Sequence, residues 1–296
     1  MPELVVMSVQ GRALYSNRRL ARAAEARGLA LRFLHPYQAQ CRLDQEGPAL
    51  DTSPPLRPPA VVLPRLGATI SDYSLALVEQ MELAGLAVVN RARAIALARH
   101  KFRTLQALAR AGLPVPPSRL VARPEELAPA AQALGGLPLV AKLPSGRQGR
   151  GVTLLESADQ LALAGQLILR QRRGLILQRF IPAQDRRDLR VLVVGDKVMG
   201  VVAYQPRPGE FRSNFHLGGR GQVLTRAHEL SRLARDACQA LGLDIAVVDI
   251  IQDGQGRAFI IEANYSPGFQ GLEQATGADV AGAMVDLCLA RAGSLE

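Results

Sequence analysis

The chain contains no tryptophan, and aromatic residues make up only 4% of its 296 residues. Proteins that bind single-stranded nucleic acid usually stack bases on aromatic side chains, so this scarcity argues against RNA binding. No apolar run approaches the roughly 18 residues that a membrane-spanning helix needs, and the chain does not start with a basic segment followed by a long apolar one. We therefore expect a cytoplasmic protein without a membrane partner.

Cysteine is also scarce, because only Cys41, Cys238 and Cys288 are present and no two of them have a C-x-x-C spacing. This pattern excludes a disulfide framework and a zinc knuckle. Small buried side chains in a reducing compartment are the simplest interpretation of all three.

Lysine is rare in a strongly basic chain, since only three of the 36 basic residues are lysine and the formal net charge is +10. The charge favours an anionic partner such as nucleic acid, nucleotide phosphates or an acidic substrate. A lysine ammonium is a compact point charge that suits phosphate, so Lys101, Lys142 and Lys197 are candidate phosphate ligands. Some arginines could form a surface for an acidic substrate, although each is individually more typical of a solvated charge: Arg18, Arg19, Arg65 and Arg207.

The first ninety residues alternate between strand and helix patterns, which predicts a small doubly wound α/β domain. The expected elements are strands at 4–9, 29–34, 60–64 and 86–89, and helices at 17–27 and 72–83. The turn after the first strand has one glycine where a dinucleotide fingerprint needs three, which disfavours an NAD site. Asn90 is placed to cap a helix at 91–99, and a further helix is expected from 101 to 111.

The rest of the chain predicts an α+β arrangement with long antiparallel hairpins. Strands are expected at 137–143, 152–156 and 174–180, with a helix at 158–170. Two hairpins follow, 189–194 with 197–204 and 244–251 with 257–263, separated by a helix at 226–241. A helix at 279–291 closes the chain.

Lys142 stands near the end of an apolar strand, and Gly146, Gly149 and Gly151 follow it in a loop that leads into a second strand. A Walker A loop has its lysine after the glycines and runs into a helix, so this segment is a strand-loop-strand flap and not a Walker A loop. Glycines allow such a flap to bring its backbone N–H groups onto phosphates, with the strand lysine reaching the same phosphates. A plain hairpin turn with a solvated lysine is the alternative.

Asp249 and Glu262 interrupt strands that are otherwise apolar. A hairpin turning about Gln255 and Gly256 would place Asp249 opposite Glu262, and Asn264 would share the face of Glu262. Two carboxylates and an amide form an oxygen donor set that suits Mg²⁺ with bound nucleotide phosphates. The alternative is a half-exposed strand with outward polar residues, but the apolar neighbours of Asp249 favour a strand covered on both faces.

The segment GEFRSNFHLGG places Arg212 and Asn214 on one face, where they could hold a phosphoryl group in transfer. A single histidine is more often structural than catalytic, so His216 is left unassigned. Asp188 and Arg190, two apart on a strand, are either a solvated pair or contacts to nucleotide and substrate.

Taken together, these segments resemble the ATP-grasp superfamily, and within it the RimK family of amino-acid ligases. The resemblance extends over nearly the whole chain through these stretches: LYSNRRL, LPRLGATISDYSLAL, AIALARHKFRTLQALARAGLPVP, LPLVAKLPSGRQGRGVTLLE, LRVLVVGDKVMG, GEFRSNFHLGG, VVDIIQ and IEANYSPGFQGLEQATGADVAG. It implies a preATP-grasp domain at 1–92 followed by an ATP-grasp module that holds ATP between antiparallel sheets, with its N-terminal lobe at 93–183 and its C-terminal lobe at 184–296.

The resemblance also implies roles for individual residues. Phosphate and nucleotide contacts, including the glycine flap and the adenine hinge, would come from Lys101, Lys142, Gly149, Gly151, Gln178, Arg179, Phe180, Ile181, Asp188, Arg190, Arg212, Ser213 and Asn214. Mg²⁺, with Mn²⁺ as an alternative, would be held by Asp249, Glu262 and Asn264. The residues nearest the chemistry would be Arg212, Lys142 and Asn264. Lys197 falls in a hairpin turn and is most simply solvated.

The implied activity is ATP-dependent ligation of glutamate to a carboxylate through an acylphosphate. The acceptor would be an acidic protein or peptide C-terminus, such as that of a ribosomal protein, or a small-molecule acid, and the family often forms tetramers. Two departures stand out: Arg179 replaces a glutamate in the usual hinge, and Tyr204 replaces a basic residue. The alternatives are a ligase for another amino acid and acceptor, and a basic RNA-binding protein with a regulatory nucleotide site.

Overall fold

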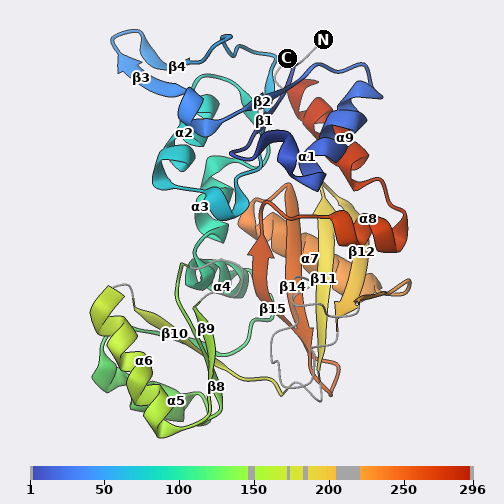
Figure 1. Ribbon diagram of the computed structural model, residues 1–296. Helices are drawn as coiled ribbons and strands as arrows, with labels where there is room; N and C mark the ends of the chain where they lie inside the picture. Colours follow the sequence, from blue (N-terminus) through green and yellow to red (C-terminus); the bar gives the residue numbers. More distant parts are fainter. Residues whose placement is uncertain (1–2, 146–150, 172–173, 183–185, 205–220, 294–296) are drawn as a thin grey trace.

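The computed structural model describes residues 3–145, 151–171, 174–182, 186–204 and 221–293. Within these ranges the chain forms three larger sheets and one small hairpin (Figure 1). Each larger sheet is covered by helices on at least one face, which gives the apolar strand residues a place to be buried.

The first sheet is parallel, with the strand order β2-β1-β5-β6. Its strands are short. They are also largely apolar, because helices cover both faces of the sheet. They are β1 (Leu4–Met7), β2 (Leu31–Leu34), β5 (Val61–Pro64) and β6 (Ala87–Val88). The associated helices are α1 (Tyr15–Glu25), α2 (Asp72–Leu83) and α3 (Ala92–Ala98), with short 3-10 turns η1 (Gly11–Ala13), η2 (Pro36–Gln38) and η3 (Gly67–Thr69). The doubly wound domain is thus confirmed.

A small antiparallel hairpin projects from this first unit where the sequence indicated only a proline-rich connection. It consists of β3 (Gln40–Asp44) and β4 (Gly47–Asp51), and Figure 1 shows it at the edge of the molecule. Gln80 of α2 anchors the hairpin by donating to the carbonyls of Arg42 and Ala49 at 3.1 and 2.8 Å.

The second sheet is antiparallel, with the order β7-β10-β8-β9. Its strands are β7 (Ser118–Val121), β8 (Leu139–Lys142), β9 (Val152–Leu155) and β10 (Leu175–Arg179), and its helices are α5 (Leu127–Ala133) and α6 (Ala158–Gln171), with the turn η4 (Pro124–Glu126). The pairing of β8 with β9 confirms that the predicted strands on either side of the glycine-rich loop are neighbours; residues 146–150 of that loop lie outside the described residues. Figure 1 shows this lobe set apart from the rest, below α4 (Lys101–Arg110).

The third sheet has the order β13-β12-β11-β14-β15 and is antiparallel throughout. It contains β11 (Arg187–Val194), β12 (Lys197–Tyr204), β13 (Gly221–Val223), β14 (Ile245–Gln252) and β15 (Ala258–Asn264). Helix α7 (His228–Leu241) covers one face, while the opposite face packs partly against the first sheet and α8 (Gln270–Thr276). Both predicted hairpins are confirmed, and the interior of β14 is covered on both faces.

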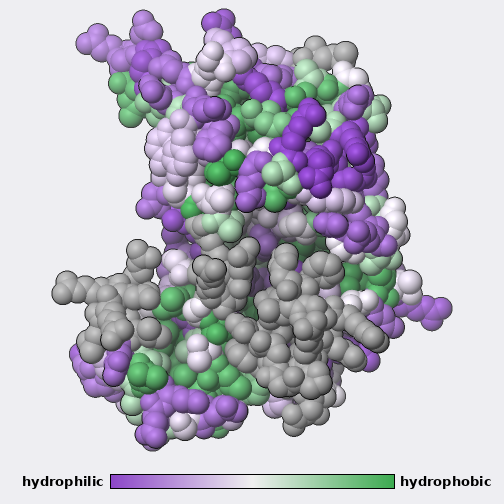
Figure 2. Space-filling view, viewed as in Figure 1, coloured by the Kyte–Doolittle hydropathy of each residue, from purple (hydrophilic) through white to green (hydrophobic). Residues whose placement is uncertain are grey.

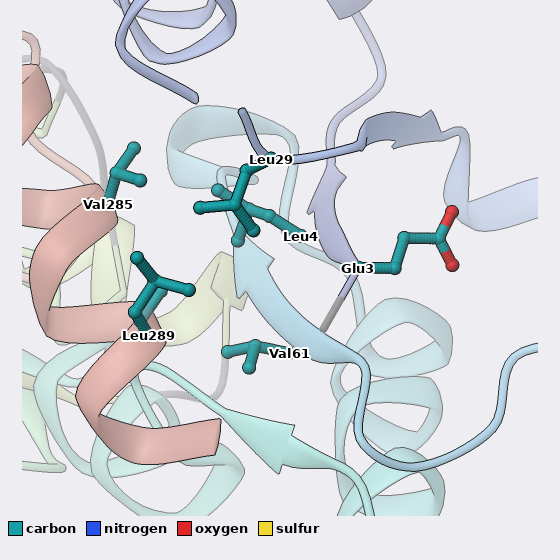
Figure 3. Close-up of a pocket in the computed structure, with 7 residues that line it drawn as sticks. Glu3, Leu4, Leu29, Val61, Val285 and Leu289 are labelled. Atoms are coloured by element: carbon teal, nitrogen blue, oxygen red, sulfur yellow. The ribbon is translucent and has the colours of Figure 1, made fainter. Parts of the chain in front are cut away.

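The last helix, α9 (Val280–Ala292), returns to the first sheet and packs against α1 and β5. Asp279 caps it by accepting from the Gly282 N–H at 3.0 Å. Figure 3 shows the apolar seam in which Val285 and Leu289 of this helix face Leu4, Leu29 and Val61. This seam lies at the start of β1 and β5, its walls are aliphatic apart from Glu3 and Cys288, and it contains none of the predicted site residues.

Candidate functional site

One group of polar side chains lies on the face of the third sheet that is turned away from α7: Arg190, Asp249, Glu262 and Asn264. The residues that alternate with them, such as Val248 and Ala263, belong to the core under α7. Asp249 pairs with Glu262 across β14 and β15, and with Arg190 across β14 and β11. A register shift next to Asp249 leaves both Glu262 and Asn264 on its face, as the sequence predicted.

Both carboxylates of this face are held by cations. Arg190 forms a two-pronged contact with Asp249, with distances of 2.8 Å from Nε to Oδ1 and 3.3 Å from Nη2 to Oδ2. Lys101, at the first position of α4, places Nζ 2.8 Å from Oε2 of Glu262. The ion pair with Lys101 brings α4 and β15 together across 161 residues of sequence.

The second sheet contributes Lys142 and Gln178, which point away from the helices that cover that sheet. Lys142 Nζ donates to Oε1 of Gln178 at 2.6 Å, and the Gln178 amide donates to the Ser118 hydroxyl at 2.8 Å. Burial lowers the pKa of Lys142 to about 8, and the nearby charge of Lys101 adds to the effect. The two lysines are therefore close enough to act on one another electrostatically.

The two carboxylates respond differently to the same surroundings. Burial raises the pKa of Asp249 despite the opposing attraction of Arg190. Desolvation also acts to raise the pKa of Glu262, but Lys101, Lys142 and Arg190 together outweigh it and lower that pKa. Arginine and lysine side chains thus lie close to both carboxylates. If another cation bound the two carboxylates, these side chains would be available to neutralise the charge of a bound polyanion.

The segment after β10 connects the lobes and holds the predicted hinge residues. Arg186 donates to the Ile181 carbonyl at 2.8 Å, lies 2.9 Å from the Asp188 carboxylate, and places its guanidinium carbon 5.9 Å from the centre of the Phe180 ring. Arg179 turns the other way, because neighbouring strand residues alternate, and donates to the Leu134 carbonyl at 3.1 Å. The cation that replaces the usual hinge acid therefore lies on the helix-covered side of the sheet.

Asn264 supplies the third oxygen of the predicted metal set, next to a tight turn. Its Oδ1 accepts from the Ser266 N–H at 3.0 Å, which fixes the amide on the face of Glu262. Among the described residues no cluster of three His, Cys, Asp or Glu side chains could hold a metal ion. The set of Asp249, Glu262 and Asn264 nevertheless fits a hard divalent cation, because carboxylate and amide oxygens are its preferred ligands and an amide completes the set.

Several predicted residues lie outside the described part of the chain: Gly149, Arg212, Ser213 and Asn214, together with the unassigned His216. Gly151 is described and has a positive φ of 75°, and its carbonyl accepts from the Leu143 N–H at 2.9 Å. A Cβ at this glycine would lie 2.7 Å from Leu143 Cδ1, so a glycine is required where β9 leaves the flap.

Two expectations from the sequence about single residues were wrong. Cys238 and Cys288 are buried as expected, but Cys41 is exposed. Asn90 does not cap α3, whose N-cap is Arg91; its buried amide instead donates to the carbonyls of Ile245 and Tyr265 at 2.8 and 2.9 Å and accepts from the N–H of Ile245 at 2.8 Å.

Of the two alternatives for Asp188 and Arg190, a pair with each other is excluded, since Asp188 pairs with Arg186 and Arg190 with Asp249. Their contact with nucleotide and substrate stays a prediction. Arg186 carried no sequence signal beyond its place after the hinge.

Tyr204, the second departure, is buried on the face of Asp249 and lies opposite Asp188 in the register of β11 and β12. Burial raises the pKa of its hydroxyl. At this end of β12 the sheet therefore presents a neutral phenol in place of a cation. None of the described helices has the length and apolar character needed to cross a membrane.

The three-sheet arrangement, with lysines and acids facing each other between two antiparallel lobes, is that of an ATP-grasp protein. The RimK PreATP-grasp domain model matches residues 3–95, and the RimK-like ATP-grasp domain model matches residues 98–288. The chain therefore belongs to the RimK family of ATP-grasp proteins, as its sequence motifs indicated.

Two curated relatives match along nearly their full length. One from Serratia proteamaculans (strain 568), named "Probable alpha-L-glutamate ligase", is 36% identical over 289 residues, which cover 96% of this chain and 94% of the relative. Another, from Shewanella amazonensis, is named "Probable alpha-L-glutamate ligase 1" and is 34% identical over 277 residues, covering 93% and 92%.

Solved structures share the fold. The RimK domain protein ATP-grasp from Sphaerobacter thermophilus superposes with a TM-score of 0.72 at 24% identity, covering 96% of this chain and 99% of that one. The ATP-grasp ligase PsnB, solved with a phosphomimetic precursor variant, Mg and ADP, gives a TM-score of 0.76 at 20% identity, covering 98% and 99%. At these identities the likeness establishes the architecture.

Proposed function

We propose that this protein is an ATP-dependent ligase that joins L-glutamate to the carboxylate of an acidic acceptor. The observation that supports it most strongly is the meeting of Lys101 and Lys142 from separate elements with the oxygen set of Asp249, Glu262 and Asn264. The names of the curated relatives support glutamate as the amino acid. An acidic protein or peptide C-terminus is the preferred acceptor, and a small-molecule acid is the alternative.

The proposed reaction has two steps. An acceptor carboxylate oxygen attacks the γ-phosphorus of ATP, the bond to the ADP oxygen breaks, and an acylphosphate forms. The amino group of glutamate then attacks the acyl carbon, loses a proton, and expels inorganic phosphate, which leaves an amide. Phosphoryl transfer of this kind requires mainly positioning and charge neutralisation from the protein.

The residues of the site divide these tasks. Lys142 and Lys101 would contact phosphate oxygens, and the glycine flap that Gly151 closes would exclude water from the acylphosphate. The segment of Phe180 and Ile181 would receive adenine through its backbone, with Asp188 and Arg190 as further nucleotide contacts. Gln178 would orient Lys142, to which it is already bonded. Arg212, Ser213 and Asn214 remain predicted phosphate ligands.

Asp249, Glu262 and Asn264 would hold Mg²⁺, with Mn²⁺ as an alternative ion. A divalent ion there supplies charge neutralisation for the nucleotide phosphates. Binding it requires the two carboxylates to share or release Arg190 and Lys101, and Lys101 freed from Glu262 would then be available to the phosphates. The domain limits 1–92, 93–183 and 184–296, and assembly into a tetramer, remain predictions of the same account.

The test is phosphate release from ATP and Mg²⁺ across the common amino acids, each with and without peptides that end in acidic residues. Turnover that depends on both L-glutamate and a carboxylate acceptor is expected. Turnover with a different amino acid would replace glutamate in the proposal, and RNA binding without any turnover would contradict it.

A further inference from the structure

The carboxyl edge of the first sheet contains a buried polar cluster that the reaction described above does not use. It consists of Ser8, Ser16, Asn17 and Arg65, which are 2%, 6%, 0% and 6% exposed. Ser8 follows β1 and Arg65 follows β5, while Ser16 and Asn17 lie in the first turn of α1. Arg65, expected from the sequence to be a solvated charge, is thus enclosed in protein.

Arg65 is a buried cation with no counter-ion among the described residues. Its Nη2 donates to the Pro267 carbonyl at 2.6 Å and to the Ser16 hydroxyl at 3.3 Å, but its buried Nε has no acceptor. Phe269 faces the guanidinium, with the ring centre 5.9 Å from Cζ. By contrast Arg186, whose side chain is 5% exposed, is paired with Asp188.

A buried guanidinium without an anion is unfavourable, and buried charges in proteins are normally paired. Burial accordingly lowers the pKa of Arg65 to about 10. Asn17 presents a second unfulfilled group: its amide donates to Ser8 and to the Gly11 carbonyl, but its buried Oδ1 accepts no hydrogen bond. The cluster thus has a spare cationic donor and a spare acceptor, which complement the carboxylate and the ammonium of an amino acid.

The position of the cluster is the one at which open α/β sheets bind ligands. The strand order β2-β1-β5-β6 means that the chain leaves β1 toward β2 on one side and reaches β5 on the other. The crevice at the carboxyl ends of β1 and β5 is therefore the topological switch point. Cβ atoms added at Gly11, whose carbonyl accepts from Asn17, and at Gly268, next to Pro267, would meet nothing within 4 Å, so the chain is uncovered at these two glycines.

The same cluster touches the segment that follows the proposed metal ligand Asn264. Arg65 bonds to Pro267, the Tyr265 hydroxyl donates to the Gly67 carbonyl at 3.3 Å, and Asn90 bonds to the Tyr265 carbonyl. A molecule bound to Arg65 would thus lie beside the turn that leads to the reacting phosphate.

We propose that Arg65 binds a carboxylate of the amino-acid substrate, in a site formed by the carboxyl edge of the first sheet and residues 265–269. This inference rests on the proposed function, because it places the amine donor of that reaction. The guanidinium provides the missing ion pair, and the orphaned Asn17 oxygen provides an acceptor for the ammonium.

The first test separates binding from positioning through steady-state kinetics of Arg65→Met and Arg65→Lys. The KM for L-glutamate should rise at least tenfold in Arg65→Met and less in Arg65→Lys, while the KM for ATP stays unchanged. Arg32→Met is the matched control, since Arg32 lies on β2 of the same sheet, is 16% exposed and is already paired with Glu3 at 3.0 Å. A fall in kcat with an unchanged KM for glutamate would make Arg65 a structural residue and overturn the proposal.

The second test needs no turnover and keeps the two proposals distinct. Thermal stabilisation of the wild type and of Arg65→Lys is measured with L-glutamate, with glutamine and with isoglutamine, each of which has one carboxylate replaced by an amide. Stabilisation of the wild type by glutamate, reduced by at least one amide and weakened in Arg65→Lys, supports the site even if glutamate is not turned over. Equal stabilisation of wild type and variant, or none by any of the three, overturns it whatever the enzyme's activity.

Discussion

Replacing Lys142 by methionine should have opposite effects on stability and on the proposed function. The pKa of this lysine falls from its ordinary value of 10.5 to about 8, which means that the folded protein holds the charge at a cost. At ~1.4 kcal/mol per pKa unit the cost is about 3 kcal/mol, reduced by the partial exposure of the side chain. Replacing the lysine removes this cost, but it also removes the hydrogen bond to Gln178, which lowers the gain in stability by about 1 kcal/mol.

Lys142→Met should therefore stabilise the protein by about 1–2 kcal/mol, a Tm increase of roughly 2–6 °C. It should also weaken ATP binding by roughly 10–100-fold, because one charged contact to phosphate is lost. Calorimetry and nucleotide titration measure both, and Lys197→Met, at the exposed first position of β12, is the control that should change neither. A lower Tm together with unchanged ATP affinity would refute the reasoning.

Four further predictions concern the pH dependence of stability, the acid Glu262, the hinge residue Arg179 and the buried Asn90. Between pH about 8 and 10.5 the unfolded chain holds the Lys142 proton that the folded chain has released, so stability should rise with pH there, and denaturant titrations should show this rise lost in Lys142→Met. Glu262→Gln should abolish turnover and destabilise by about 1–3 kcal/mol, because it leaves Lys101 without its partner, whereas exposed Glu46→Gln should change neither rate nor Tm. Arg179→Ala should leave the KM for ATP unchanged and cost under about 1 kcal/mol, because its side chain is on the far side of the sheet; a raised KM would contradict that placement. Asn90→Ala should cost about 2–4 kcal/mol by chemical denaturation, since it strips buried backbone groups of their partners; a change below 0.5 kcal/mol would contradict it.

The parts of the site that depend on strand pairing could be predicted from the sequence. The turn around Gly256, which has a φ of 80°, was predicted, and the strand ends beside it pair Gln252 with Ala258 and Ile250 with Ile260. Continued without a break, this register would place Asp249 opposite Ile261, and the register shift next to Asp249 brings Glu262 opposite it instead. The apolar neighbours of Asp249 correctly indicated a covered strand, because both faces of β14 lie in cores. Local pattern and turn chemistry therefore predict the pairing of the two strands but not the bulge that sets the register at Asp249.

The rest depends on contacts between segments far apart in the chain, for which no local pattern exists. Asn90 has a side chain that often caps helices. In the structure its amide instead forms hydrogen bonds with four backbone groups, which belong to Asp244, Ile245 and Tyr265. Nothing in the sequence around Lys101 indicated its pairing with Glu262. The burial of Arg65 likewise follows from the packing of the first sheet against residues 267–269, which joins segments about two hundred positions apart.

The most direct test of the central claim is mass spectrometry of an acidic-tailed peptide incubated with the enzyme, ATP, Mg²⁺ and isotopically labelled L-glutamate. The account predicts peptide mass increments of whole labelled glutamyl residues, with one phosphate released per residue added and none formed by Glu262→Gln. Phosphate release without any labelled product, on peptides or on small carboxylic acids, would contradict it.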